Sequence, residues 1–250
     1  GEEMYSVNSP GFAGGDRTSI ELPQVQRDIL KALKKAGKKV VFVNCSGSAV
    51  ALVPEMESCD AILQAWYPGQ AGGLAVADVL FGDFNPSGKL PVTFYKNTDQ
   101  LPDFEDYSMK NRTYRYMTEV PLFPFGYGLS YTTFNISKGR LNKKTISAGQ
   151  DLNFKVNVKN TGKYDGAEVI QVYVRKVDDA EGPIKSLRAF RRVPLKAGET
   201  CVVSIDLLPT TFEFFDPTTN TMRIMPGKYE IMYGNSSDIP SGNKLSVTLR

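Results

Sequence analysis

Hydrophobic and polar positions change their period near residue 140, and this change predicts two architectures in one chain. Before it, short apolar runs alternate with segments whose apolar residues recur at helical spacing, which is typical of layered α/β folds. After it, apolar and polar residues alternate in run after run, as in strands with one buried face. We therefore predict an α/β domain at 1–139 and an all-β domain at 140–250.

The α/β part is predicted to form a partial open sheet with flanking helices. Strands are predicted at 39–43, 60–66 and 90–94, and helices at 22–37, 48–59 and 72–80. The run KVVFV at 39–43 suits a parallel strand buried on both faces, whereas Pro54 is expected to interrupt the helix around it. Residues 96–120 lack periodicity and are expected to form a long ordered loop.

The all-β part is predicted to form an immunoglobulin-like sandwich. Strands are predicted at 152–158, 167–174, 187–194, 200–208, 228–233 and 244–249. Turn residues such as Gly162, Gly198 and Pro226-Gly227 separate the strands at roughly regular intervals. About seven short strands in a segment of this length are typical of a β-sandwich.

Composition and charge narrow the possible functions. The net charge of +3 is too small to indicate binding to nucleic acid or an anionic membrane, and no apolar run is long enough to span a bilayer. Histidine is absent from the sequence, which excludes Ser-His-Asp and Cys-His catalysis and disfavours a zinc site. The widely spaced Cys45, Cys59 and Cys201 are predicted to be small buried hydrophobes, not metal ligands or disulfide partners.

Several motifs follow one another in a fixed order. The most informative is AWYPGQAGGLAVADVLFGDFNPSGKLPVTF at 65–94, and others are GGDR at 14–17, RTYRY at 112–116 and FPFGYGLSY at 123–131. VKNTGKYDGAEVIQVYV at 158–174 lies within the predicted sandwich. Together they resemble the C-terminal α/β sandwich domain of glycoside hydrolase family 3, closest to its β-xylosidase-like branch, followed by a fibronectin type III-like domain.

The resemblance implies a reaction and a further domain. Enzymes of this family are retaining exo-β-glycosidases, and such enzymes need two carboxyl groups about 5–5.5 Å apart. The family's nucleophile is an aspartate on a preceding (β/α)8 barrel, which is missing here, so this chain alone is expected to be inactive. The acid/base lies in a loop resembling LEGEEM. Because the chain begins with GEEM, Glu2 and Glu3 are candidate acid/base residues, as is a glutamate just before Gly1.

Other residues are candidates for sugar contacts. Asp16 and Arg17 could bind a sugar hydroxyl or fix the shape of their glycine-rich loop. Trp66 follows a predicted strand, at the edge where ligands bind in open α/β sheets, and could stack on a sugar or pack against apolar neighbours. The acidic stretch at 103–107 fits no known calcium-loop spacing. Its acidic groups are expected to pair with nearby arginines or to pack on the missing barrel.

We therefore predict the C-terminal portion of a β-xylosidase-like enzyme that hydrolyses terminal β-linked sugars of plant-type oligosaccharides. A β-glucosidase of the same family is the first alternative. A non-enzymatic carbohydrate-binding or scaffolding module is the second, and an independent hydrolase using only these residues is the third.

The expected partners follow from this interpretation. They are an oligosaccharide and the missing barrel, with neither nucleic acid nor a membrane. No metal or organic cofactor is implied, because carboxyl groups perform both chemical roles. An exposed edge of the parallel sheet predicts self-association or a covering N-terminal segment. By the habit of the family, the enzyme would be periplasmic or secreted.

Overall fold

The computed structural model describes residues 12–13 and 16–250, with side-chain contacts from Arg17 onward. It contains two compact units. The first holds the residues up to 81 together with 92–112 and 117–123, and the second holds 82–91, 113–116 and 124–250. The first unit is α/β and the second is dominated by a β-sandwich, which confirms the predicted fold class. The proposed boundary between residues 139 and 140 stays a prediction.

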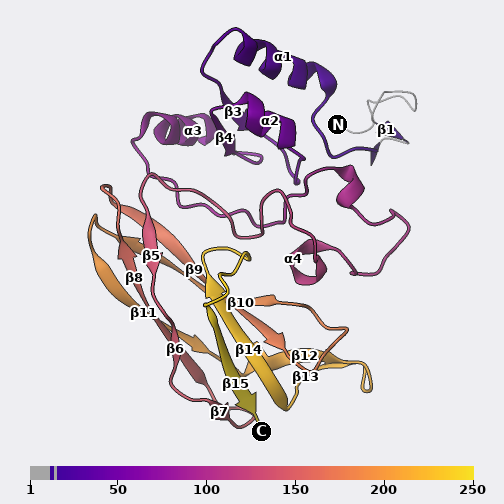
Figure 1. Cartoon of the computed structure of the whole chain (residues 1–250), viewed down its shortest axis with the longest axis vertical. Coiled ribbons are helices and arrows are strands. Elements are labelled where there is room, and N and C mark those ends of the chain that lie inside the picture. The colour runs from indigo at the N-terminus through magenta and orange to yellow at the C-terminus, as the bar shows by residue number, and fades with distance from the viewer. Residues whose placement is uncertain (1–11, 14–15) are drawn as a thin grey trace. The chain divides into compact units, whose positions relative to one another are not determined.

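The first unit consists of short strands and helices. Its elements are β1 (Phe12–Ala13), β2 (Asp16–Arg17), α1 (Gln24–Lys35), β3 (Val41–Asn44), α2 (Val53–Ser58), β4 (Ala61–Gln64), α3 (Gly72–Phe81) and the 3-10 helix η2 (Thr98–Gln100). β3 and β4 are parallel, with Val41 opposite Ala61 (Figure 1). This pairing confirms a parallel sheet, of which two strands lie in the described part of the chain.

The predicted ends of α1 are confirmed, whereas the predicted role of Pro54 is wrong. Pro23 directly precedes α1, and Gly37 follows it with φ 68°, as expected for a left-handed helix stop. The prediction that Pro54 interrupts a helix is wrong, because Pro54 lies in the first turn of α2. The N–H that proline lacks has no partner in the first turn of any helix, so proline is tolerated there.

The predicted strand at 90–94 is also wrong. Pro91 has no N–H to extend a strand ladder. Leu90 instead exchanges backbone hydrogen bonds with the FPFGYGLSY segment: its N–H donates to the Tyr127 carbonyl at 2.8 Å, and its carbonyl accepts the Gly126 N–H at 2.8 Å. Phe94 makes an isolated bridge with Phe123. The loop at 96–120 contains η2 and the short helix α4 (Thr113–Tyr116).

Burial differs from the expectation for one strand and for two of the three cysteines. Val41 of β3 is 50% exposed, so this strand is not buried on both faces in the described chain. The reason is that β4 is the one strand paired with β3 among the described residues. Cys45 is exposed and Cys201 is partly exposed, and of the three predicted buried thiols only Cys59 is buried.

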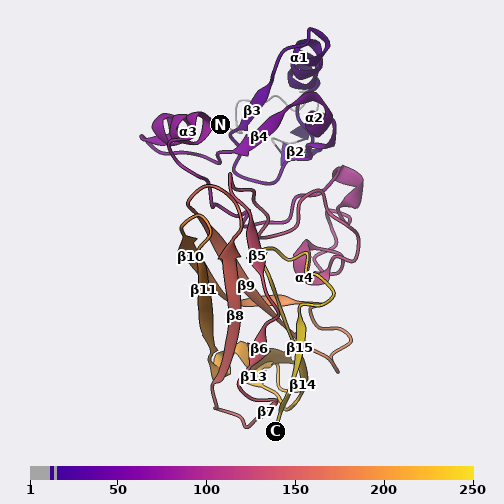
Figure 2. The same ribbon diagram turned by 60° about the vertical axis from the view of Figure 1, so that its left-hand side comes forward.

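The second unit contains two packed sheets and a hairpin. The first sheet has the order β10 (Ser186–Leu195), β9 (Gly166–Lys176), β14 (Gly227–Gly234), β15 (Lys244–Leu249) and β7 (Thr145–Ile146). The second has the order β11 (Thr200–Leu207), β8 (Leu152–Asn160) and β5 (Phe134–Ile136), with β6 (Arg140–Leu141) also paired to β8 (Figure 2). A short 3-10 helix, Pro209–Phe212, precedes the hairpin of β12 (Glu213–Asp216) and β13 (Thr221–Ile224).

The core of this unit lies between the two sheets. Apolar residues alternate with polar ones along β8, and its burial alternates in step, as the sequence pattern predicts. Phe154 of β8 packs against Tyr233 of β14, with ring centroids 5.0 Å apart. The Tyr233 hydroxyl accepts the N–H of Gly139 at 2.6 Å. The six strands expected in the sandwich are all present.

Candidate functional site

The carboxyl ends of β3 and β4 carry a cluster of polar side chains. The Asn44 side-chain amide donates to the Gln64 side-chain oxygen Oε1 at 2.6 Å and to the Ser46 hydroxyl at 3.1 Å. Gln64 in turn donates to the backbone carbonyl and the hydroxyl of Ser46 at 3.3 and 3.2 Å. These bonds fix the loop that follows β3. Ligands of open α/β sheets bind at this edge of the sheet, so the cluster occupies the expected place for a substrate-facing surface.

Trp66 stands at the same edge, two residues after β4 ends. Its backbone has φ 58°, a left-handed conformation that a large side chain adopts only when its surroundings impose it. The indole meets the buried Phe94 ring edge-on at 6.2 Å, and the side chain is partly exposed. Trp66 therefore has an apolar anchor, and its role in sugar binding stays a prediction.

Glu21 has the largest pKa displacement among the carboxyl groups that the structure describes in the first unit. Its oxygens accept hydrogen bonds from the Ser19 hydroxyl and from the Thr98 N–H and hydroxyl, the last two at 2.9 and 2.6 Å. Burial acts to raise its pKa, but these hydrogen bonds outweigh burial and lower the pKa to about 2. A carboxyl group in this state has no proton to give at neutral pH, so Glu21 anchors the η2 loop and is unsuited to act as a general acid.

The residues predicted for catalysis and sugar binding fall in or near the least described part of the chain. Glu2 and Glu3 lie outside the described residues. Asp16 is described through its backbone, which pairs with Ala13 between β1 and β2. The Arg17 guanidinium is exposed and donates to the Glu21 carbonyl at 2.9 Å. This contact holds the loop before α1. The proposed catalytic and sugar-binding roles of these residues stay predictions.

The acidic loop does not form the expected ion pairs. Asp103 and Asp106 accept the N–H groups of Glu105 and Ser108, two residues further on, as in Asx turns. Arg112 donates to the backbone carbonyls of Asp103 and Asp106 rather than to their carboxylates. Among the residues that the structure describes, no group of three acidic, cysteine or histidine side chains could hold a metal ion.

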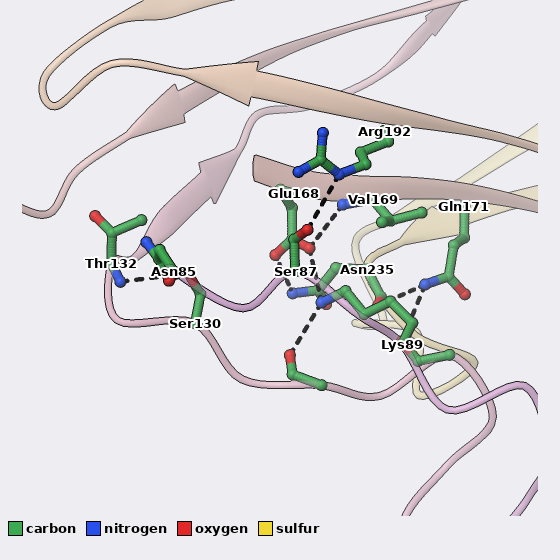
Figure 3. Close-up of polar contacts among 12 residues, drawn as sticks. Asn85, Ser87, Lys89, Ser130, Thr132, Glu168, Val169, Gln171, Arg192 and Asn235 are labelled. Atoms are coloured by element: carbon green, nitrogen blue, oxygen red, sulfur yellow. Dashed lines mark hydrogen bonds and ion pairs between the residues drawn. The ribbon is translucent and has the colours of Figure 1, made fainter. Parts of the chain in front are cut away.

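A buried ion pair organises the motif segments of the second unit. The Lys89 ammonium of the NPSGK turn lies 2.7 Å from the Glu168 carboxylate of β9, and both side chains are largely buried. Glu168 also accepts the Asn235 amide at 2.9 Å and the Val169 N–H at 2.8 Å, while Lys89 donates to the Gly128 carbonyl at 3.0 Å. Figure 3 shows Lys89 and Asn235 converging on the Glu168 carboxylate. The hydrogen bonds that Lys89 donates and Glu168 accepts compensate for burying the two charges.

Gln171 extends the same network along β9. Its amide N–H groups donate to the carbonyls of Gly126 at 3.1 Å and Asn235 at 2.7 Å. Its carbonyl oxygen accepts the Tyr173 hydroxyl at 2.5 Å. A Cβ on Gly126 would lie 2.0 Å from the Gln171 side-chain oxygen, and Gly126 has φ 78°, so glycine is required here.

Hydrogen bonds of Asn85 and Ser87 connect the NPSG turn to distant segments of the second unit. Asn85 accepts the Ser130 hydroxyl and the Tyr131 N–H, each at 2.8 Å, and donates to the Asp165 carbonyl at 2.8 Å. The Arg192 Nε–H donates to the Ser87 hydroxyl at 3.1 Å (Figure 3). In the sequence, Asn85 and Ser87 stand out only as members of the motif at 65–94. Polar side chains in a tight turn were the available signal for a hydrogen-bond network, but their partners lie far along the chain, so no local pattern identifies them.

The fold and the network define a class of protein: an α/β unit followed by a fibronectin type III-like sandwich, with the segment around NPSGK fixed to the sandwich by a buried polar network. The C-terminal domain of glycosyl hydrolase family 3 matches residues 1–131, and a fibronectin type III-like domain matches residues 168–237. The chain belongs to glycosyl hydrolase family 3, which confirms the resemblance drawn from the motifs.

Two relatives illustrate the range of activities in this family. A xylan 1,4-β-xylosidase of Xylanibacter ruminicola is 61% identical over 100% of this chain, which spans 28% of that protein. A periplasmic β-glucosidase of Salmonella typhimurium is 41% identical over 92% of the chain, which spans 32% of that protein.

Solved structures agree with this assignment. A β-glucosidase from Erythrobacter marinus superposes with a TM-score of 0.83 at 37% identity, covering 96% of this chain and 32% of that one. A β-glucosidase from Listeria innocua in complex with glucose gives a TM-score of 0.80 at 31% identity, covering 96% of this chain and 35% of that one. The chain thus spans about a third of the length of these relatives.

Proposed function

We propose that this chain is the C-terminal portion of a retaining exo-β-glycosidase that removes terminal β-linked xylose from xylan-derived oligosaccharides. The observation that carries the proposal is the 61% identity, over the whole chain, to a xylan 1,4-β-xylosidase. Retaining hydrolysis needs a nucleophilic carboxylate and an acid/base carboxyl on opposite sides of the scissile bond. The nucleophile belongs to a barrel in the rest of the enzyme, and Glu2 and Glu3 are the candidates for the acid/base.

Exposed apolar surface in the first unit supports a longer enzyme. Val25 and Ile29 of α1 are 65% and 55% exposed, and one helical turn separates them, so they form a stripe on one face. Val41 of β3 is 50% exposed. We take the exposed apolar stripe of α1 as a face that another structure covers. We propose that the remainder of the enzyme covers it. Self-association of the isolated chain is the second possibility. Sedimentation velocity of the isolated chain tests it, because a self-associating chain sediments as a dimer or larger species and a chain that does not self-associate sediments as a monomer.

Localisation and cofactor use follow from the same proposal. One relative is a periplasmic β-glucosidase, which supports a periplasmic or secreted enzyme. None of the helices in the described chain has the length and hydrophobicity of a membrane-spanning segment. Because carboxyl groups perform both chemical roles, the proposed reaction uses neither a metal nor an organic cofactor. Trp66, Asp16 and Arg17 are proposed to contact the sugar or to shape the loops that do.

A β-glucosidase is the second candidate, because several relatives and solved structures are β-glucosidases. The test compares release of p-nitrophenol from its β-xyloside and β-glucoside by this chain and by the same chain extended along its natural reading frame. We expect the extended protein alone to be active, with a higher kcat/KM for the xyloside. A preference for the glucoside would replace the substrate assignment. Activity of the short chain alone would overturn the proposal that the nucleophile lies elsewhere.

A non-enzymatic carbohydrate-binding module remains the third candidate. It predicts that xylo-oligosaccharides bind to the short chain and that the extended protein hydrolyses neither glycoside. Isothermal titration with xylotriose on both proteins distinguishes this function from that of an enzyme portion.

A further inference from the structure

Unpaired buried donors gather at one place in the second unit. Six buried side-chain atoms lack a hydrogen-bond partner among the described residues. Three of them belong to Arg27 and Glu55, whose Nε and Oε1 lie 3.3 Å apart as an ion pair. The other three are the Nε atoms of Arg115 and Arg188 and the hydroxyl of Ser186. The last three therefore need a separate explanation.

Arg115 and Arg188 come from two segments that are bonded together. The Ile184 N–H donates to the Arg115 carbonyl at 2.8 Å, and the Leu187 N–H donates to the Tyr114 hydroxyl at 3.1 Å. These bonds hold α4 against the beginning of β10. Arg188 is the residue at which β10 shifts its register on β9, so it occupies a β-bulge. A bulge turns a side chain out of the regular alternation and is frequent beside functional sites.

Aromatic rings and a carbonyl hold the two guanidinium groups without neutralising them. Arg188 lies 4.9 Å from the Phe214 ring centroid and donates to the Glu213 carbonyl at 2.6 Å. Arg115 lies 5.6 Å from the Tyr116 ring centroid. No ion pair of the described chain includes either arginine. Burial, followed by the charge of Arg115, lowers the pKa of Arg188, as expected for two neighbouring cations without an anion between them.

We propose that Arg115 and Arg188 together form a binding site for a single carboxylate group. A guanidinium presents Nε–H and Nη–H in a planar fork that matches the two oxygens of a carboxylate, so the unpaired Nε–H groups are the donors expected to bind it. The negative charge removes the repulsion between the two arginines. The negative charge of Glu213 already attracts the Arg188 guanidinium. The two arginines therefore need only one further negative charge, which a carboxylate supplies and a dianion exceeds.

The site is tested on the 250-residue chain with sodium glucuronate as the carboxylate probe and glucose as its neutral counterpart. Glucuronate at about ten times its dissociation constant is expected to raise the unfolding midpoint by about 3 °C at constant ionic strength, whereas glucose leaves it unchanged. Arg115→Met is the main variant, because the Arg115 side chain makes no hydrogen bond to the described residues and its loss should not prevent folding. The variant is expected to lose at least tenfold in affinity by isothermal titration.

Arg191→Met is the matched control, because Arg191 is exposed on the same strand and outside the site. It should bind glucuronate as the unmodified chain does. Equal shifts for the chain and for Arg115→Met would overturn the proposal, as would equal shifts for glucuronate and glucose. Tighter binding of inorganic phosphate than of glucuronate would overturn the assignment to a carboxylate.

The extended protein identifies the source of the carboxylate. If the extended protein still binds glucuronate, and Arg115→Met weakens that binding, the site serves an acidic sugar or another free carboxylate. If only the short chain binds glucuronate, an acidic side chain of the remaining enzyme fills the site. Both readouts are binding measurements, so they are independent of the proposed hydrolytic activity.

Discussion

Replacing Lys89 with methionine tests the network that joins the motif segments. The substitution keeps most of the side-chain volume but removes the ammonium that lies 2.7 Å from Glu168. The side chains are 13% and 7% exposed, so the Glu168 carboxylate would stay buried without its cation. At this distance the attraction is worth about 6 kcal/mol for an effective dielectric constant of about 20.

The expected loss of stability is smaller than the attraction. Desolvation offsets part of the Coulomb energy, and breaking a buried ion pair by removing one partner typically costs about 3–5 kcal/mol. The Asn235 amide and the Val169 N–H still donate to Glu168 in the variant. We therefore expect a loss near the lower end, about 3 kcal/mol, which corresponds to a fall of about 6–12 °C in the unfolding midpoint.

The assay follows the second unit through the near-ultraviolet circular dichroism of its buried tyrosines during urea unfolding. Tyr173, Tyr229 and Tyr233 lie in the sandwich, whereas the single tryptophan, Trp66, lies in the first unit. Lys155→Met serves as the control, because Lys155 is exposed on β8 and its loss should change stability by less than about 0.5 kcal/mol.

The double variant Lys89→Met/Glu168→Gln separates the buried charge from packing. It removes both charges, so it should be more stable than Lys89→Met alone. The reasoning is refuted if Lys89→Met costs less than about 1 kcal/mol. A double variant more stable than Lys89→Met would identify the unpaired carboxylate as the cause of the loss.

Three further predictions concern a glycine, a carboxylate and the proposed acid/base. Gly126→Ala should cost about 3 kcal/mol in urea unfolding, because its Cβ meets a buried amide, whereas Gly198→Ala, with the same φ of 78° but open space around it, should cost about 1 kcal/mol. Glu21 has a pKa lowered from 4.5 to about 2, so its contribution to stability is complete above pH 4.5 and is lost as the pH falls toward 2. Solvent screening keeps that contribution near 1 kcal/mol, and Glu21→Gln should remove this part of the acid-induced loss in thermal melts between pH 6 and about pH 2.5. In the extended enzyme, one of Glu2→Gln and Glu3→Gln should lose far more kcat on xylobiose than on p-nitrophenyl xyloside, whose leaving group needs no proton; equal losses on both substrates would contradict the acid/base role.

Much of the architecture could be predicted from the sequence, because the strands and helix ends depend on residues close together in the chain. Period-two alternation predicted β8 with its buried and exposed faces, because a strand whose one face meets a core must alternate. Pro23 and Gly37 marked the ends of α1 through backbone constraints that act within one turn. Sequence reasoning was wrong for the segment at 90–94, where an apolar run containing Pro91 exchanges hydrogen bonds with a distant loop instead of joining a sheet.

The sequence by itself determined the order of elements, the change from α/β to all-β and the family, because these depend on local periodicity and on motifs written in the chain. Only the tertiary structure decided which polar residues are partners. Lys89 finds Glu168, and Arg115 is brought to the bulge at Arg188, through contacts between distant segments that no local pattern encodes. Burial was likewise decided in three dimensions, because the exposure of Val41 depends on which strands lie beside it.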